Sequence, residues 1–223
     1  TRDNNDWLIR QQIEGTVPAE INREAIHAID RGVDSIGIKL NREVTAADLE
    51  TILKDIDLKK VEVNISCCNG KAVEIAAILV DYIKANGLEN DFRGSIGFDP
   101  FKRLLRHGLA FPKNIKDEAL KLYNTVKEIK NLRCFVVDSN LLNNAGAYIT
   151  QELGYALAWG AEWMTILTEA GLTPCEVAGR IKFNMGISSN YFMELAKFRA
   201  ARMLWAEIVK AYGAEEECCK MMV

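Results

Sequence analysis

The sequence predicts an α/β fold, a (β/α)8 TIM-type barrel that is incomplete in this chain, and three observations support this class. First, runs with strand spacing alternate with runs with helical spacing, in about six strand–helix units. This alternation favours a parallel sheet with right-handed crossovers. Second, the 223 residues are fewer than the ~250 of a typical complete barrel. Third, neither G-x-G-x-x-G nor G-x-x-x-x-G-K-[ST] occurs, so we favour the barrel over an open doubly wound sheet.

Six segments are expected to be strands, because apolar residues recur at every second position or form short buried runs. In the second segment, Ile36, Ile38 and Leu40 share one face, which is the spacing of a strand. The expected strands are 7–11, 33–40, 61–67, 94–97, 132–137 and 181–187.

Each expected strand is followed by a segment with helical spacing. Pro18 suits a first helical turn. Thr45 and Asp48 form a capping-box pattern, with Asp in place of the usual Glu or Gln. Asn143 or Asn144 is expected to cap the fifth helix. The expected helices are 18–29, 45–53, 73–83, 115–129, 143–157 and 190–212.

Composition and charge exclude several classes of protein. Hydrophobic residues make up 49% and charged residues 26%, as in ordinary soluble globular domains. No apolar run approaches the ~20 residues of a membrane span. The net charge of −3 and the absence of a basic block make nucleic acid a poor partner. We therefore expect a cytoplasmic protein that binds neither membrane nor nucleic acid.

The cysteines form two adjacent pairs and two single residues. This spacing fits neither C-x-x-C metal sites nor the disulfide density of a small secreted scaffold. We expect reduced thiols, buried or partly exposed, and no zinc or other metal site. The six residues are Cys67, Cys68, Cys134, Cys175, Cys218 and Cys219.

The two ends predict a piece of a longer protein. The chain begins at Thr1 without Met or a secretion-signal pattern, and it stops in the apolar run 218–223. We expect residues 1–223 to form a single barrel domain, a fragment of a longer chain.

In a barrel of this kind, chemistry is located where the strands end. Asp99 and Asp138 stand at neighbouring strand ends and could divide acid and base roles. Against this, Asp138, Asn143 and Asn144 are residue types that cap the next helix, and Asp99 before Pro100 opens an ordinary turn. The residues alone therefore predict only a barrel fragment whose strand ends carry no recognisable catalytic group. The polar residues at the strand ends are Asn69, Asp99, Asp138, Ser139, Asn140, Asn143, Ser188 and Asn190.

Six stretches carry a family resemblance, and the last two are long and specific. They are 6–11 (DWLIRQ), 69–70 (NG), 111–112 (FP), 144–147 (NAGA), 151–157 (QELGYAL) and 192–202 (FMELAKFRAAR). In this order the chain resembles the substrate-binding barrel of the methylmalonyl-CoA mutase family over nearly its whole length. The resemblance implies an adenosylcobalamin-dependent radical rearrangement of an acyl-CoA, in which the barrel positions the thioester and excludes water.

The chain departs from the family at the catalytic positions. Asn140 and Leu141 stand where catalytic members have a Tyr-His pair, and Gly97 stands where they have Gln. Leucine can neither donate a proton nor form a hydrogen bond, so we expect no catalytic residue here. The resemblance leaves Arg106 and Asn69 as candidate substrate-binding residues, and Arg106 matches the arginine that pairs with the substrate carboxylate.

The face that would line the family's tunnel for CoA also departs from the Ser and Thr of catalytic members. Because side chains alternate along a strand, one face of each strand has gained bulk, and we expect a partly filled tunnel. The residues at these positions are Val63, Ile65 and Cys67 on the third strand and Cys134, Val136 and Asp138 on the fifth.

These departures resemble the small, non-catalytic subunit of heterodimeric members, which stabilises a homologous large subunit. The resemblance implies methylmalonyl-CoA and succinyl-CoA as the whole enzyme's acyl-CoA substrates. It also implies adenosylcobalamin in the whole enzyme but not on this fragment, which lacks the C-terminal cobalamin-binding domain and its D-x-H-x-x-G motif. One alternative is an active family mutase with another substrate, using Asp138. The other is an unrelated barrel enzyme using Asp99 and Asp138.

Overall fold

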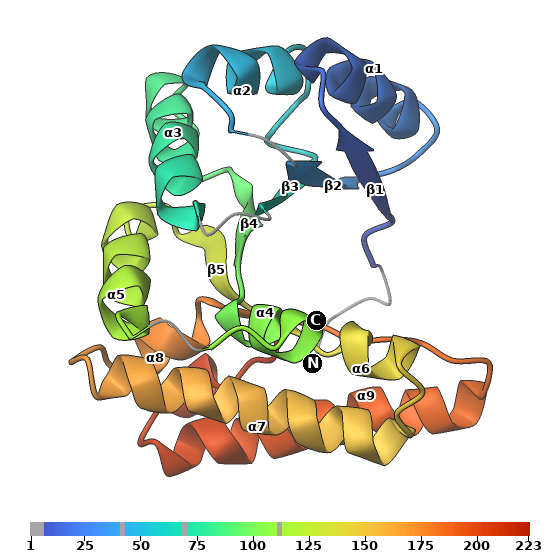
Figure 1. Ribbon diagram of the computed structural model, residues 1–223, viewed down its shortest axis with the longest axis vertical. Coiled ribbons are helices and arrows are strands. Elements are labelled where there is room, and N and C mark those ends of the chain that lie inside the picture. Colours follow the sequence, from blue (N-terminus) through green and yellow to red (C-terminus); the bar gives the residue numbers. More distant parts are fainter. Residues whose placement is uncertain (1–6, 41–42, 68–70, 111–112) are drawn as a thin grey trace. The chain divides into compact units, whose positions relative to one another are not determined.

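The computed structural model describes residues 7–40, 43–67, 71–110 and 113–223 (Figure 1). Along these residues strands and helices alternate, as the sequence predicts. The strands are β1 Arg10–Gly15, β2 Ser35–Leu40, β3 Glu62–Cys67, β4 Arg93–Phe98, β5 Asn131–Asp138 and β6 Ile181–Asn184. The helices are α1 Pro18–Ile29, α2 Ala46–Leu53, α3 Ala72–Ala85, α4 Pro100–His107, α5 Ile115–Val126, α6 Asn140–Asn144, α7 Ile149–Thr168, α8 Pro174–Ala178, α9 Tyr191–Ala211 and the 3-10 turn η1 Glu216–Cys218.

The chain divides into two compact units. Unit 1 is Thr1–Phe98 with Leu122–Leu132, and unit 2 is Asp99–Lys121 with Arg133–Val223. Every strand pair within a unit is parallel, which confirms the α/β class. The closed barrel and the single domain over residues 1–223 stay predictions.

Unit 1 is a parallel sheet in the order β1-β2-β3-β4, with α1, α2 and α3 along one side of it (Figure 1). The register places four isoleucines side by side, one from each strand, and all are buried: Ile13, Ile38, Ile65 and Ile96. A Cβ built on Gly15 would lie 2.9 Å from Cγ1 of Ile21 on α1. Because residues of one parity share a face, the isoleucine row faces the helices.

This register corrects one prediction about the faces of the sheet. Val63 and Ile65 lie on the face covered by helices, so the expectation that they line the opposite face is wrong. The side chain of Cys67 lies outside the described residues. Successive residues of a strand point to opposite faces, so Ser35, Asn64 and Ser95 lie on the other face of β2, β3 and β4. That face is therefore polar.

Unit 2 pairs β5 with β6, and α7 and α9 run side by side (Figure 1). Phe135 of β5 packs on Trp163 of α7 with ring centroids 5.0 Å apart. Phe183 of β6 packs edge-on against Trp205 of α9 at 4.8 Å. Alternation then places Cys134, Val136 and Asp138 on the face away from α7, as the sequence predicts for this strand.

Most element boundaries follow the sequence signals. Pro18 is the first residue of α1, and Thr45 and Asp48 form the expected reciprocal capping box. The first strand begins at Arg10 instead of residue 7, where the side chains are exposed. The last strand stops at Asn184 instead of residue 187, because the polar groups of Gly186 bond to side chains of unit 2.

The prediction that Asn143 or Asn144 caps the long fifth helix is wrong. Those residues belong to the short helix α6, and α7 starts after Tyr148. The Tyr148 N–H donates to Oε1 of Gln151 at 2.8 Å. The side chain of the third residue of α7 thus satisfies the backbone N–H of the residue before the helix.

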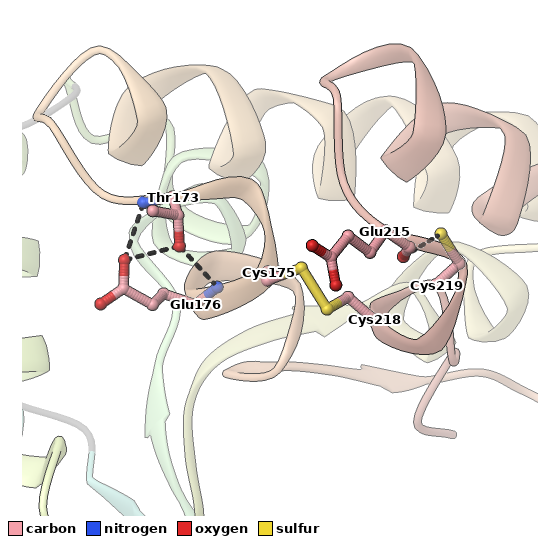
Figure 2. The surroundings of a disulfide bond; sticks show 6 residues. All are labelled: Thr173, Cys175, Glu176, Glu215, Cys218 and Cys219. Carbon is pink, nitrogen blue, oxygen red and sulfur yellow. Dashed lines mark hydrogen bonds between the residues drawn. A yellow bond between two sulfur atoms is a disulfide. The ribbon is translucent and has the colours of Figure 1, made fainter.

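The expectation of reduced cysteines throughout is also wrong. Cys175 and Cys218 form a disulfide with a Cα–Cα distance of 5.2 Å, which is within the usual range (Figure 2). Spacing could not reveal this bond, because the two residues are 43 positions apart and only the fold of unit 2 brings them together. Cys134 and Cys219 are free and buried.

Among the residues that the structure describes, every helix is too short or too polar to cross a bilayer. The same residues contain no cluster of three or more His, Cys, Asp or Glu side chains arranged to hold a metal ion.

Candidate functional site

Two aspartates stand where chemistry would be expected in unit 2. Asp99 directly precedes α4, and its Oδ1 accepts a hydrogen bond from the Lys102 backbone N–H at 3.0 Å. Asp138 ends β5, and its carboxylate pairs with the Lys102 ammonium. Lys102 is therefore the link between the two acids: its backbone N–H bonds to one oxygen of Asp99, and its side chain pairs with Asp138.

Asp99 is the acid whose environment is unusual. Its second oxygen, Oδ2, is buried and has no hydrogen-bond partner among the described residues. Burial raises the pKa of Asp99 to about 8, with the nearby Asp138 charge acting in the same direction and the Lys102 N–H acting against it. A carboxyl group with this pKa exchanges its proton close to neutral pH, which is what general acid–base chemistry requires.

A second cluster of charges lies in the interior of unit 2. The Lys197 ammonium donates to Oε2 of Glu152 at 2.8 Å and to the Gly186 carbonyl at 2.7 Å. It also forms an ion pair with Glu194 at 2.6 Å. The Lys197 and Glu152 side chains are completely buried. Such charges are tolerated in the interior only when they are paired and hydrogen-bonded, as Lys197 is.

The two carboxylates of this cluster hold the loop between β6 and α9. Oε1 of Glu152 accepts from the Gly186 N–H at 2.7 Å. Oε1 of Glu194 accepts from the Ser188 N–H at 2.9 Å and from its hydroxyl at 2.6 Å. Burial raises the pKa of Glu194, but hydrogen bonds from Lys197 and Ser188 outweigh it and lower the pKa below its usual value.

The same cluster also holds the end of β5. The Ser139 hydroxyl donates to Oε1 of Glu152 at 3.3 Å, and the Asn143 side chain donates to Oε2 of the same residue at 3.2 Å. A Cβ built on Gly186 would lie 2.3 Å from Cγ of Asn143, so only glycine fits at this close approach. The cluster therefore fixes the segments after both strands of unit 2.

The sequence carries one local signal of this cluster. Glu194 and Lys197 are three residues apart on a helix, so they lie on one face. That face also carries the buried residues Ala201, Trp205 and Val209, and its spacing therefore predicts that Glu194 and Lys197 are buried too. The partner on α7, Glu152, lies 45 residues from Lys197 and could not be assigned without the fold.

The residues expected to replace the family's catalytic pair form a helical turn. Asn140 is the first residue of α6, and its Oδ1 accepts from the Asn144 side chain at 2.6 Å. Leu141 is half-buried on the same turn. Gly97 lies in β4, where a Cβ would be 3.5 Å from Cβ of Ser66, a contact that is not crowded.

Of the two candidate substrate-binding residues, the structure describes only Arg106. Arg106 lies near the end of α4 and is exposed. Asn69 lies outside the described residues. No described contact joins Arg106 to Asp99 or Asp138, although all three belong to unit 2.

The polar face of the unit 1 sheet is a third feature of interest. The Asn64 side chain donates to Oγ of Ser35 at 3.1 Å and accepts from the Ser95 hydroxyl at 2.6 Å. Glu62 accepts from both Ser35 and Asn64. Toward the carboxyl ends of the strands, Lys39 pairs with Glu14 at 3.0 Å. This face is hydrophilic, unlike the bulky apolar lining that the sequence predicts for β3.

Comparison with known proteins decides the family. The sequence profile of methylmalonyl-CoA mutase matches residues 43–223, which is most of the chain. The chain belongs to the methylmalonyl-CoA mutase family. The resemblance expected from its segments is thereby confirmed, and the two longest of them, in α7 and α9, supply Glu152, Glu194 and Lys197.

Similar members of the family include two small subunits. The chain is 47% identical over 96% of its length to the methylmalonyl-CoA mutase small subunit of Porphyromonas gingivalis, and covers 35% of that protein. It is 27% identical over 96% of its length to the small subunit of Propionibacterium freudenreichii subsp. shermanii, covering 34% of that relative. Mitochondrial methylmalonyl-CoA mutase of Homo sapiens is 30% identical over 82% of the chain. The chain spans about a third of the length of the small subunits it matches.

Proposed function

We propose that this chain is part of the small, non-catalytic subunit of an adenosylcobalamin-dependent methylmalonyl-CoA mutase. The whole enzyme would be an isomerase that interconverts methylmalonyl-CoA and succinyl-CoA in the propionate metabolism of the cytoplasm. The observation that carries the proposal is the 47% identity to a small subunit over 96% of the chain. Its partner would be a homologous catalytic large subunit, with which it forms a heterodimer.

The local structure after β5 supports a site without catalytic residues. Asn140 and Leu141 occupy a helical turn that is bonded within itself, and Leu141 offers no proton. Gly97 offers no side chain at the place of the family's glutamine. Among the described residues, the charged groups of unit 2 at 152, 194 and 197 hold its own backbone. The role that these contacts favour is to keep a scaffold rigid for a partner.

The fold proposed for the whole protein is the (β/α)8 barrel, of which residues 1–223 form a single-domain fragment. The polar face of unit 1 would then line a tunnel that still admits part of an acyl-CoA. Arg106 and Asn69 remain the candidates for contact with the acyl-CoA.

The histidines of this chain do not match the family's cobalamin-binding motif. His27 and His107 are both exposed on helix surfaces, and neither stands in a D-x-H-x-x-G motif. The cofactor would supply the radical chemistry of the whole enzyme from elsewhere.

One observation favours the alternative, an active enzyme of this family with another acyl-CoA or of unrelated chemistry. The unpartnered Oδ2 of Asp99, with its pKa of about 8, is suited to exchange a proton. Asp138 would be its partner, but Lys102 already neutralises that acid.

Substitution of these two acids in the full chain separates the proposals. With the large homologue added, the Asp99→Asn and Asp138→Asn variants should support the same rate of methylmalonyl-CoA isomerisation as the unchanged chain. Both substitutions keep the size of the side chain and remove its acid–base capacity. A loss of tenfold or more in kcat, at an unchanged affinity for the large homologue, would favour the alternative.

A further inference from the structure

The Cys175–Cys218 bond joins two segments that lie 43 positions apart in the sequence. Cys175 lies in the first turn of α8, whose start is closed by Thr173 and Glu176 in a capping box (Figure 2). Cys218 ends η1, which follows the last long helix. The bond thus connects a rigid helix start to the segment that runs from residue 214 to residue 223.

The tethered segment continues directly to β6. The Phe183 N–H donates to the Met222 carbonyl at 2.9 Å, which is a bond of the kind that adds a neighbour to a sheet. Only three residues lie between Cys218 and Met222. An anchor at Cys218 therefore limits how far the segment can move from the strand that carries Phe183.

The surroundings distinguish the bonded cysteines from the free one beside them. Cys175 and Cys218 are only partly buried, so a small thiol can reach the bond. Cys219 is buried, and its Sγ donates to the Glu215 carbonyl at 3.3 Å (Figure 2). Burial and this hydrogen bond keep Cys219 out of exchange with its neighbour.

We propose that Cys175 and Cys218 are a reversible thiol–disulfide modification site that fastens residues 214–223 to α8. Closing the site oxidises the two thiols by two electrons: a low-molecular-weight disulfide RSSR is reduced to two RSH as the S–S bond forms. Opening is the reverse exchange, in which a dithiol is oxidised to its own disulfide and both cysteine thiols are restored. The proposal goes beyond the proposed function and does not depend on it.

Charge at the site favours one class of reductant. Four exposed glutamates flank the bonded cysteines. Glu176 directly follows Cys175, and Glu215, Glu216 and Glu217 directly precede Cys218. Lys220 is the one exposed base within two residues of Cys218. The excess of negative charge repels an anionic thiol such as glutathione. A neutral dithiol should therefore reduce the bond faster than glutathione at low salt, and added salt should narrow the difference.

The first test maps the bond in the full chain after exposure to oxidised glutathione. Free thiols are blocked with N-ethylmaleimide, and the protein is digested without reduction and analysed by mass spectrometry. We expect the peptides of Cys175 and Cys218 to be joined, with Cys219 labelled only after denaturation. Cys219→Ser is the matched control and should keep the joined peptides, whereas Cys175→Ser should lose them. Full labelling of Cys175 and Cys218 in the oxidised protein would overturn the proposal.

The second test asks whether the bond fastens the segment. Reduction of the unchanged chain by a neutral dithiol avoids any folding defect of a variant. It should lower Tm by roughly 8–16 °C, because the bond closes a long loop. It should also speed cleavage by a glutamate-specific protease at residues 215–217. Equal Tm and equal cleavage in the oxidised and reduced protein would overturn the proposal, as would a bond that excess dithiol fails to open.

Discussion

Lys197 is the single residue on which the interior charges of unit 2 depend most. One ammonium group serves two buried carboxylates and a backbone carbonyl. Replacing such a cluster with apolar residues is often harmless, but removing one member leaves charges buried without a partner. The contribution of Lys197 is therefore visible mainly as the penalty for deleting it.

Lys197→Ala should lower the free energy of unfolding by about 3–5 kcal/mol, because Glu152 and Glu194 are left buried without their cation. Lys210→Ala is the matched control on the same helix. Lys210 is exposed and lies 3.7 Å from Glu207, so its loss should cost less than about 1 kcal/mol. Urea unfolding of both variants measures the difference. Similar values for the two would show that the buried cluster contributes nothing.

Asp99 makes stability depend on pH in a direction opposite to that of most acids. Its pKa is raised to about 8 in the folded chain, so between its unfolded pKa and pH 8 the folded state binds more protons. Stability is then highest at low pH in this window and falls as pH rises. The slope from this one group is at most about 1.4 kcal/mol per pH unit, and solvent screening reduces it.

Asp99→Asn should remove that penalty while keeping the hydrogen bond from the Lys102 N–H, because Asn also caps helices well. We expect the variant to match the unchanged chain in Tm at pH 5 and to exceed it at pH 8. Thermal unfolding across this range measures the effect. A Tm difference that does not change with pH would contradict the raised pKa.

At the scale of elements, strong local signals in the sequence were sufficient to predict where some helices begin. Pro18 and the Thr45–Asp48 box start their helices where predicted, because caps act within one turn. The helices α4 and α8 were missed, since each is short and its apolar spacing does not repeat. The Asn143 amide, expected to cap the next helix, instead bonds to Glu152, a contact that depends on tertiary packing.

The packing of α7 on α9 depends on one glycine. A Cβ on Gly160 would lie 2.6 Å from Cζ3 of Trp205 and 2.8 Å from Cζ of Phe183. Rings of this size cannot shift by the required distance in a packed interior. The absence of a side chain at this position is thus what lets α7 approach the aromatic pair.

Gly160→Ala should destabilise the chain by about 1–3 kcal/mol through overpacking. Gly154→Ala is the control on the same helix, since a Cβ there meets no atom within 4 Å. It should instead stabilise the chain by about 0.5–1 kcal/mol through its higher helix propensity. Differential scanning calorimetry of the two variants should therefore give Tm shifts of opposite sign. Two shifts of the same sign would be inconsistent with the close approach.

At the scale of the whole molecule, the order of segments was enough to predict the family and the alternation of parallel strands with helices. The faces of the sheet were predicted correctly for β5 and wrongly for β3. Because a shift of one residue exchanges the faces of a strand, an alternating pattern alone leaves the choice open when both faces are buried. Asn64 shows this: it is fully buried, yet it belongs to the polar face.

In the candidate site, too, the local features could be predicted from the sequence and the long-range contacts could not. The sequence identifies Asn140, Leu141 and Gly97 as departures from the catalytic pattern, because these are local identities. It could not identify the Glu152–Lys197 pair or the Cys175–Cys218 bond, because each joins residues more than 40 positions apart. Long-range pairs such as these become visible only when the fold of unit 2 is known.

The most direct test of the proposed function is the adenosylcobalamin-dependent isomerisation of methylmalonyl-CoA by the full chain, alone and mixed with its larger homologue. A non-catalytic small subunit predicts turnover in the mixture and none by the chain alone. Turnover by the chain alone would contradict this account and would require a catalytic group in place of Leu141.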